Sequence, residues 1–295
     1  MTQSIRTRRH VVEARRAEAH RRDRVGLGRG NVGKRPRSGR REIHLRVSVQ
    51  RSDGKALMPL LCGDNPLSNT ATTKFLRLTD TQLFLIRHGQ SANNQLEAEA
   101  GHGRDRVPDP HLTELGRRQA RLLADHVVIG ALPRPDQLFT SLMHRAVETA
   151  APLAEALDVP LWGHSLLHEV NGVYTGEYAG LSTRGTPDPG SPASVLGAIS
   201  DRLRWPPDAD AEGWYRRPFE LPEEAWVRAQ GVAAEFRERF GGTDAVVGLV
   251  THAWFCQYLL RALADWPPAG DGDLPTWLEL GNTGTVLVEV DAGPG

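Results

Sequence analysis

Short apolar runs alternate with longer stretches of mixed polarity along residues 82–290. Runs bounded by turn-forming residues predict buried strands over 82–87 (QLFLIR), 136–140, 245–251 (AVVGLVT) and 285–290. Apolar residues spaced three and four positions apart predict helices over 113–128, 142–157, 223–240 and 254–263. This alternation predicts an α/β fold, a three-layer sandwich with a mostly parallel central sheet flanked by helices.

The segment 113–128 has the most complete set of helix signals. Thr113 is positioned to cap its first turn, and Glu114 adds a negative charge to that turn. Four apolar residues are expected to share its buried face: Leu115, Leu122, Leu123 and Val127.

Composition divides the chain into a basic extension and a folded domain. Residues 1–50 contain 15 Lys and Arg but only 4 Asp and Glu, a charge of +11, whereas residues 51–295 carry −11. We expect 1–75 to be a disordered basic arm, because an Arg- and Gly-rich segment cannot bury enough apolar surface to offset its ordering entropy. Residues 76–295 then form one domain, in which 182–222, rich in Pro, Gly and Asp, is a lid-like insert.

Three interpretations of the basic arm remain open. It is a disordered tail, or an upstream stretch read from a start site set before Met58; an electrostatic arm for nucleic acid; or an organelle transit peptide. No aromatic residue interrupts the arginines, which argues against a stacking surface for single strands, so nucleic acid is not the expected partner.

Compartment and assembly are only weakly indicated by the sequence. Two cysteines offer no disulfide framework, and no apolar run reaches the ~20 residues of a membrane helix. We therefore expect a cytoplasmic protein without membrane contact. No pattern specifies an oligomeric state.

Basic side chains follow the predicted strands at the ends where ligands bind in parallel sheets. Strand 82–87 ends in Arg87 and runs into His88, strand 245–251 runs into His252, and Arg145 lies shortly after strand 136–140. Guanidinium groups match phosphate oxygens in bidentate fashion, and a neutral imidazole is nucleophilic near pH 7. Such a set could transfer a phosphoryl group without a metal if a carboxylic acid protonated the leaving group.

Four segments resemble the histidine phosphatase superfamily, which includes phosphoglycerate mutases. Leu85–Asn94 (LIRHGQSANN) resembles its Arg-His-Gly signature, and 112–120 (LTELGRRQA) resembles its Leu-Thr-x-x-Gly-x-x-Gln-Ala segment. Residues 141–150 (SLMHRAVETA) and 250–253 (VTHA) resemble the Ser-x-x-x-Arg-Ala-x-x-Thr-Ala and strand-end histidine segments. The four occur in the family's order, and the resemblance implies its phosphoglycerate mutase-like fold over about 82–290.

The resemblance implies a role for each matching residue. His88 is the phosphorylated nucleophile, His252 the second histidine, and Glu169 the proton donor, with Glu148 and Glu177 as rival acids. The implied phosphate-binding residues are Arg87, Ser91, Asn94 and Arg145. Within the insert, we expect Trp214, Tyr215 and Arg217 to shape the pocket for the leaving group.

We expect a phosphomonoester hydrolase for a small-molecule phosphomonoester, with no cofactor and no metal. Residues 168–180 lack the Glu-Arg-His-Tyr-Gly stretch of phosphoglycerate mutases, which favours hydrolysis over phosphate shuffling. A mutase and a non-catalytic phosphate-binding regulator remain alternatives. The remaining histidines show no metal-ligand spacing and are expected to be solvated: His102, His111, His126, His144 and His164.

Overall fold

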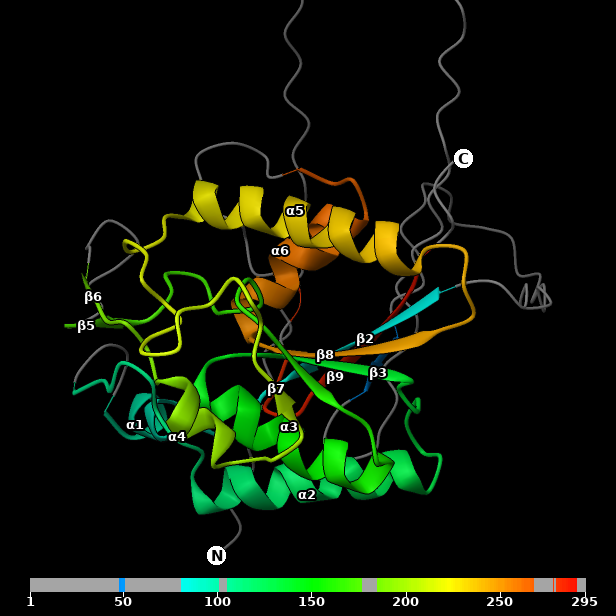
Figure 1. The fold of residues 1–295 in the computed structure, drawn as a ribbon, viewed down its shortest axis with the longest axis horizontal. Coiled ribbons are helices and arrows are strands. Elements are labelled where there is room, and N and C mark those ends of the chain that lie inside the picture. The colour runs from blue at the N-terminus through cyan, green and yellow to red at the C-terminus, as the bar shows by residue number, and fades with distance from the viewer. Residues whose placement is uncertain are drawn as a thin grey trace, which may run out of the picture. The chain divides into compact units, whose positions relative to one another are not determined.

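The computed structural model describes residues 48–50, 81–100, 105–176, 185–267, 278 and 280–290. Apart from strand β1 (Ser48–Gln50), the predicted basic extension 1–75 lies outside the described residues. The domain is the predicted α/β sandwich, with a mostly parallel sheet between two layers of helices (Figure 1). No helix in the described ranges combines the length and apolarity needed to cross a membrane.

The central sheet has seven strands in the order β1-β9-β2-β8-β3-β4-β7. Its other strands are β2 (Thr81–Arg87), β3 (Gln137–Ser141), β4 (Leu161–His164), β7 (Leu203–Arg204), β8 (Val246–Thr251) and β9 (Thr285–Val290). The five strands from β2 to β7 are parallel, whereas β9 is antiparallel to both β2 and β1.

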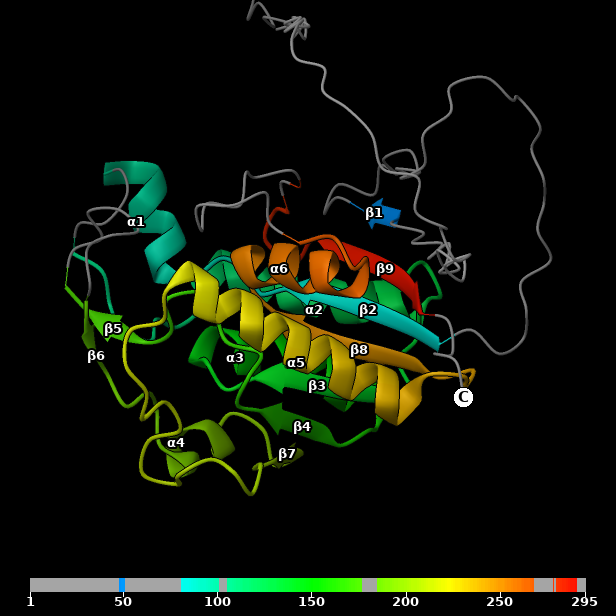
Figure 2. The same ribbon diagram turned by 90° about the horizontal axis from the view of Figure 1, so that it is seen from above.

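Helices cover both faces of this sheet. Figures 1 and 2 show α2 (Glu114–Val128) and α3 (His144–Leu157) on one face, and α5 (Pro222–Phe240) and α6 (Ala253–Leu263) on the other. Shorter elements lie at the periphery: α1 (Ala92–Ala100), α4 (Ala193–Gly197) and the two-stranded sheet of β5 (Tyr174–Thr175) and β6 (Thr186–Pro187).

The position of strand β2 between two layers of helices explains the continuous apolar run in its sequence. Leu83 and Leu85 belong to the core beneath α5 and α6, whereas Phe84 and Ile86 belong to the core beneath α2 and α3. Because both faces of the strand are covered, all four positions from 83 to 86 are apolar.

Helix α2 confirms its predicted cap but corrects its predicted face. The Thr113 hydroxyl accepts a hydrogen bond from the Gly116 N–H at 3.0 Å. Leu115 and Leu122 are 42% and 55% exposed, so their assignment to the core was wrong. The buried face keeps the predicted Leu123 and Val127 and is completed by three small residues that allow close packing on α3: Gly116, Ala120 and Ala124.

Candidate functional site

The site lies at the carboxyl ends of β2, β8 and β3. Arg87 is level with Thr251 across the β2–β8 pair, so the next residues, His88 and His252, are neighbours. Their ring centroids are 5.1 Å apart. The first turn of α3, which follows β3, brings Arg145 to the same place, where its Nε donates to His88 Nε2 at 3.1 Å. The predicted convergence is thus present.

Two motif glycines allow the segment after β2 to pack tightly against α2. A Cβ on Gly89 would lie 2.7 Å from the Gly116 carbonyl oxygen, and a Cβ on Gly116 would lie 2.1 Å from the Gln90 carbonyl oxygen. Any larger residue at either position would force the two backbones apart. The glycines therefore fix the position of the His88 backbone relative to α2.

His88 is held in one tautomer inside the protein. Its Nδ1 lies 2.6 Å from the Gly89 carbonyl oxygen, an acceptor only, so Nδ1 carries the proton and Nε2 has the lone pair. Burial, together with the charges of Arg145 and Arg87, lowers the pKa of His88 well below its ordinary value of 6.5. The imidazole is therefore neutral at pH 7, with its nucleophilic nitrogen facing a guanidinium.

Arg145 stays charged in spite of its burial. Desolvation lowers its pKa to about 10, while the negative charges of Asp109 and Glu169 act in the opposite direction. Asp109 also accepts from the backbone N–H of His144, which holds the first turn of α3 in place. A positive charge beside a neutral imidazole is a pairing suited to nucleophilic attack on a phosphoryl group.

His252 is fully buried and presents one nitrogen without a partner. Its Nε2 lies 2.9 Å from the Ser141 hydroxyl, and its Nδ1 has no hydrogen-bond partner among the described residues. Burial and the charge of Arg145 lower its pKa well below 6.5. Ser141, at the end of β3, therefore orients the second histidine.

Ser91 and Asn94 form a small hydrogen-bonded network with a residue from the other end of the domain. The Asn94 side-chain oxygen accepts from the Ser91 N–H, the Ser91 hydroxyl and the Asn282 amide, all between 3.1 and 3.2 Å. The same Asn282 amide also donates to the His88 carbonyl at 3.3 Å. Arg87 is anchored close by, where its Nη1 donates to the Leu280 carbonyl.

Glu169 lies at the N-terminus of α6, whose first residue follows His252. Its Oε1 accepts from the backbone N–H groups of Val170 and Phe255, both at 2.9 Å. Its Oε2 accepts from Trp254 at the longer distance of 3.3 Å. The carboxylate is near enough to influence Arg145 electrostatically. Among the rival acids, Glu148 binds the Leu112 N–H, and Glu177 lies outside the described residues.

The three predicted insert residues occupy different surroundings. Trp214 and Tyr215 are buried, with ring centroids 6.0 and 5.0 Å from that of His168. Arg217 is half-buried, and its Nη2 lies 3.5 Å from the Ser165 hydroxyl. His168 is itself close enough to contribute to the lowered pKa of His252. The two aromatic rings thus contact His168, and His168 in turn lies near His252.

Several site residues were missed by sequence reasoning. Arg106 comes near enough to lower the pKa of Arg145, and its guanidinium lies over the Tyr174 ring at 4.8 Å. Thr149 accepts from the Gly89 N–H at 2.9 Å. The sequence could have indicated Thr149, because it is the Thr of the Ser-x-x-x-Arg-Ala-x-x-Thr-Ala segment. Arg106 lies outside the four motif segments, so nothing in the local sequence marks it.

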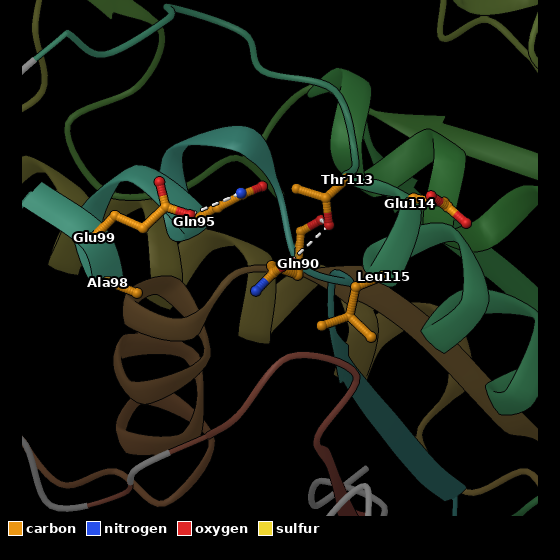
Figure 3. Close-up of a pocket in the computed structure, with 7 residues that line it drawn as sticks. All are labelled: Gln90, Gln95, Ala98, Glu99, Thr113, Glu114 and Leu115. Carbon is orange, nitrogen blue, oxygen red and sulfur yellow. Dashed lines mark hydrogen bonds between the residues drawn. The ribbon is translucent and has the colours of Figure 1, made fainter.

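A polar hollow adjoins the motif at Gln90 (Figure 3). It has a volume of about 350 Å³ and lies between the part of α1 from Gln95 to Glu99 and the first turn of α2. The Gln90 side-chain oxygen accepts from the Thr113 hydroxyl at 2.7 Å, and Gln95 donates to Glu99. The Gln90 side chain is thereby bound to Thr113, the residue that caps α2 beside the site.

The expectation that the remaining histidines are solvated was wrong for two of them. The side chain of His144 is only 6% exposed, and that of His164, which pairs with Glu235, is 11% exposed. His144 also lies with His111 and Glu148 in a group whose ligand atoms all fall within 4.8 Å of one another. Within the described ranges, this is the only group of three such side chains with a spacing that suits a metal ion.

Comparison with known proteins connects this site to a family. Residues 83–294 match the family model of the histidine phosphatase superfamily (branch 1). A probable phosphatase of Schizosaccharomyces pombe is 40% identical over 90 residues, covering 30% of this chain and 39% of that protein. A 2,3-bisphosphoglycerate-dependent phosphoglycerate mutase of Nocardia farcinica is 38% identical over 80 residues, covering 26% and 29%. The chain thus spans less than half the length of each of these curated relatives.

Two solved structures from mycobacteria are also similar. Mycobacterial hydrolase 2 is 22% identical with a TM-score of 0.45, covering 74% of this chain and 85% of its own. A mycobacterial glucosyl-3-phosphoglycerate phosphatase, solved with vanadate, is 23% identical with a TM-score of 0.42, covering 70% and 90%.

Proposed function

Because the chain belongs to the histidine phosphatase superfamily (branch 1), we propose that it hydrolyses a phosphomonoester through a phosphohistidine on His88, without a metal ion. The observation that carries the proposal is the state of this imidazole. Its proton is held on Nδ1 by the Gly89 carbonyl, and its Nε2 lone pair faces the guanidinium of Arg145. A neutral nucleophile surrounded by cations is suited to attack a phosphoryl dianion.

In the first step, Arg145 exchanges its bond to His88 Nε2 for bonds to the phosphoryl oxygens of the substrate. Nε2 then attacks phosphorus, and the bond from phosphorus to the leaving oxygen breaks as the P–N bond forms. Arg87 and Arg145 offset the charge on the phosphoryl oxygens, the neutral His252 donates a hydrogen bond to one of these oxygens, and the Ser91–Asn94 network borders the pocket.

Glu169 is the proton donor in this scheme. The leaving oxygen takes a proton from Glu169, and in the second step the carboxylate accepts a proton from the water that attacks the phosphohistidine. The P–N bond breaks, so free phosphate is released and His88 is restored. Oε2 is the better candidate to carry the proton, because its single bond to the Trp254 N–H is longer than the two bonds of Oε1.

For the leaving group, we propose a small-molecule alcohol bordered by the insert. Trp214 and Tyr215 are buried, so their contribution is to support His168 from behind, whereas the half-buried Arg217 is available to contact the substrate. Replacing Arg217 by Gln should therefore change the preference among substrates more than the affinity for inorganic phosphate.

A mutase is the second candidate, because the chain is 38% identical over 80 residues to the phosphoglycerate mutase of Nocardia farcinica. The two reactions share the phosphohistidine and differ in its acceptor. A mutase would isomerise its substrate, depend on a bisphosphate primer and release little phosphate. The departure of residues 168–180 from the mutase sequence supports water as the acceptor.

The test is a panel of phosphomonoesters assayed for phosphate release in excess EDTA. We expect activity toward at least one substrate, and a loss of about 1,000-fold or more in His88→Ala. His126→Ala, a substitution of the same kind on α2, is the matched control and should retain full activity. Activity that requires an added metal, or that survives in His88→Ala, would contradict the proposal.

A further inference from the structure

We propose that His111, His144 and Glu148 form a binding site for one Zn²⁺ ion next to the catalytic arginine. The three side chains come from two elements. His144 and Glu148 lie one turn apart on α3, and His111 lies in the segment that leads into α2. Two imidazoles and one carboxylate form a ligand set that zinc uses in proteins, with a fourth position left for water.

The distances suit a tetrahedral ion. Nδ1 of His144 is 3.4 Å from Glu148 Oε2, and Nδ1 of His111 is 3.9 Å from Glu148 Oε1. Bonds of 2.0–2.2 Å around zinc place neighbouring ligand atoms about 3.4 Å apart. The His144–Glu148 spacing already matches this value, and all three ligand atoms lie within 4.8 Å of one another, so the exposed His111 side chain has to move inward to complete the set.

One ligand atom is buried and has no hydrogen-bond partner. Nδ1 of His144 belongs to a side chain that is 6% exposed, and no described residue makes a hydrogen bond to it. Its 3.4 Å approach to Glu148 is an ion-pair distance without hydrogen-bond geometry. The nitrogen thus faces the carboxylate without a hydrogen bond to it, and a metal ion between the two side chains would bind both.

The surroundings provide both access and support. The His111 side chain is 65% exposed, so an ion can enter from solvent. The Glu148 carboxylate accepts a hydrogen bond from the Leu112 N–H at 2.5 Å, and hydrogen bonds of this kind orient the ligands in known metal sites. The rings of His111 and His144 are tilted by 55° with centroids 3.7 Å apart, so the two imidazoles are direct neighbours.

Arg117 is the charge that opposes binding. Its Nη1 lies 3.5 Å from Glu148 Oε1, but it is half-exposed and makes its shorter bond, 2.8 Å, to the Leu112 carbonyl. An ion would displace the long contact and leave the short one in place. Removing this charge should therefore strengthen metal binding, whereas removing any ligand should weaken it.

Occupancy would join the loop before α2 to the first turn of α3. Arg145 follows His144 directly, so the ion would fix the backbone from which the phosphate-binding guanidinium extends. The chemistry proposed above does not use this ion. The two proposals can therefore fail independently, since phosphatase activity is tested in EDTA and metal binding is tested by spectroscopy.

The experiment titrates the EDTA-stripped full-length protein with CoCl₂ and then displaces the cobalt with ZnCl₂. We expect one equivalent of Co²⁺ with the visible absorption of a tetrahedral site, lost on addition of one equivalent of Zn²⁺. The Tm should rise by about 5 °C or more at a free Zn²⁺ concentration about 100-fold above Kd.

Three variants decide the assignment. His111→Ala, at an exposed position that leaves the fold intact, should weaken Zn²⁺ binding by more than about 100-fold. Arg117→Gln should strengthen binding about tenfold. His126→Ala, the histidine control outside the cluster, should bind like the parent protein. Absence of the tetrahedral spectrum, or unchanged affinity in His111→Ala, would overturn the proposal.

Discussion

The buried ion pair between Arg228 and Glu220 should contribute strongly to the stability of the domain. Arg228 donates from Nε and Nη2 to the two carboxylate oxygens, both at 2.6 Å, and the side chains are only 6% and 10% exposed. Its Nη1 donates to the carbonyls of Leu166 and His168, in the loop that precedes Glu169. The guanidinium of Arg228 thus connects α5 to the end of the insert and to the loop that precedes Glu169.

Replacing Arg228 with Met retains most of the side-chain volume but leaves the Glu220 carboxylate buried without its cation. It also removes the donor to two backbone carbonyls and the contact of the guanidinium with the Phe255 ring, 4.0 Å away. Breaking a buried pair on one side costs about 3–5 kcal/mol of unfolding free energy. Because about 1.4 kcal/mol corresponds to a tenfold change, the folding equilibrium should fall by at least about 100-fold.

Urea unfolding, followed by circular dichroism, measures this loss. Arg118→Met is the matched control, because Arg118 pairs with Glu114 at 2.7 Å while the two side chains are 52% and 84% exposed. That pair should be worth no more than about 0.5 kcal/mol. The double variant Arg228→Met/Glu220→Gln should regain part of the loss, because the uncompensated charge is then absent.

Equal losses in Arg228→Met and Arg118→Met would refute the reasoning, because the Arg228 pair is buried and has further bonds to the backbone, whereas the Arg118 pair is exposed. A loss in Arg228→Met without any recovery in the double variant would show that the backbone carbonyls, and not the carboxylate, dominate the effect.

Three further predictions concern the site and the backbone around it. Burial and two guanidinium groups lower the pKa of His88 well below 6.5, so the imidazole remains neutral as the pH falls through 6.5. The value of kcat/KM should therefore decrease only at lower pH, and a decrease centred on pH 6.5 would contradict this. Gly172→Ala should cost about 1–3 kcal/mol more in urea unfolding than Gly130→Ala, because both have φ of +76° but only the first would place a Cβ 1.7 Å from the Tyr215 hydroxyl; equal costs would contradict that contact. Asn282→Ala should lower kcat/KM about fivefold, the effect of one hydrogen bond of about 1 kcal/mol, and initial rates that match the parent would show that its bonds do not support the pocket.

The sequence predicted the convergence of the two histidines because this convergence follows from one rule of sheet geometry. Parallel strands that each end in a basic residue bring those residues to the same edge of the sheet, and the register of β2 with β8 makes His88 and His252 neighbours. The Thr113 cap signal was equally local and was confirmed at the start of α2.

What the sequence did not predict depends on long-range packing. Asn282 reaches Asn94 across 188 residues, and no local pattern marks such a contact. Helix α1 (ANNQLEAEA) has too few apolar residues to show a helical period, so it was missed. Leu122 was placed in the core by its hydrophobicity, but the small residues on the neighbouring face of α2 are the ones that pack against α3.

The central claim is that His88 carries the phosphoryl group between substrate and water. The most direct measurement is rapid quenching of the reaction with ³²P-labelled 4-nitrophenyl phosphate, whose leaving group needs no proton from Glu169, using Glu169→Gln to slow only the second step. We predict a phosphoprotein that is labile in acid and stable in alkali, with the label mapped by mass spectrometry to residue 88. A label on another residue, or phosphate released at the full rate without labelled protein, would contradict the account.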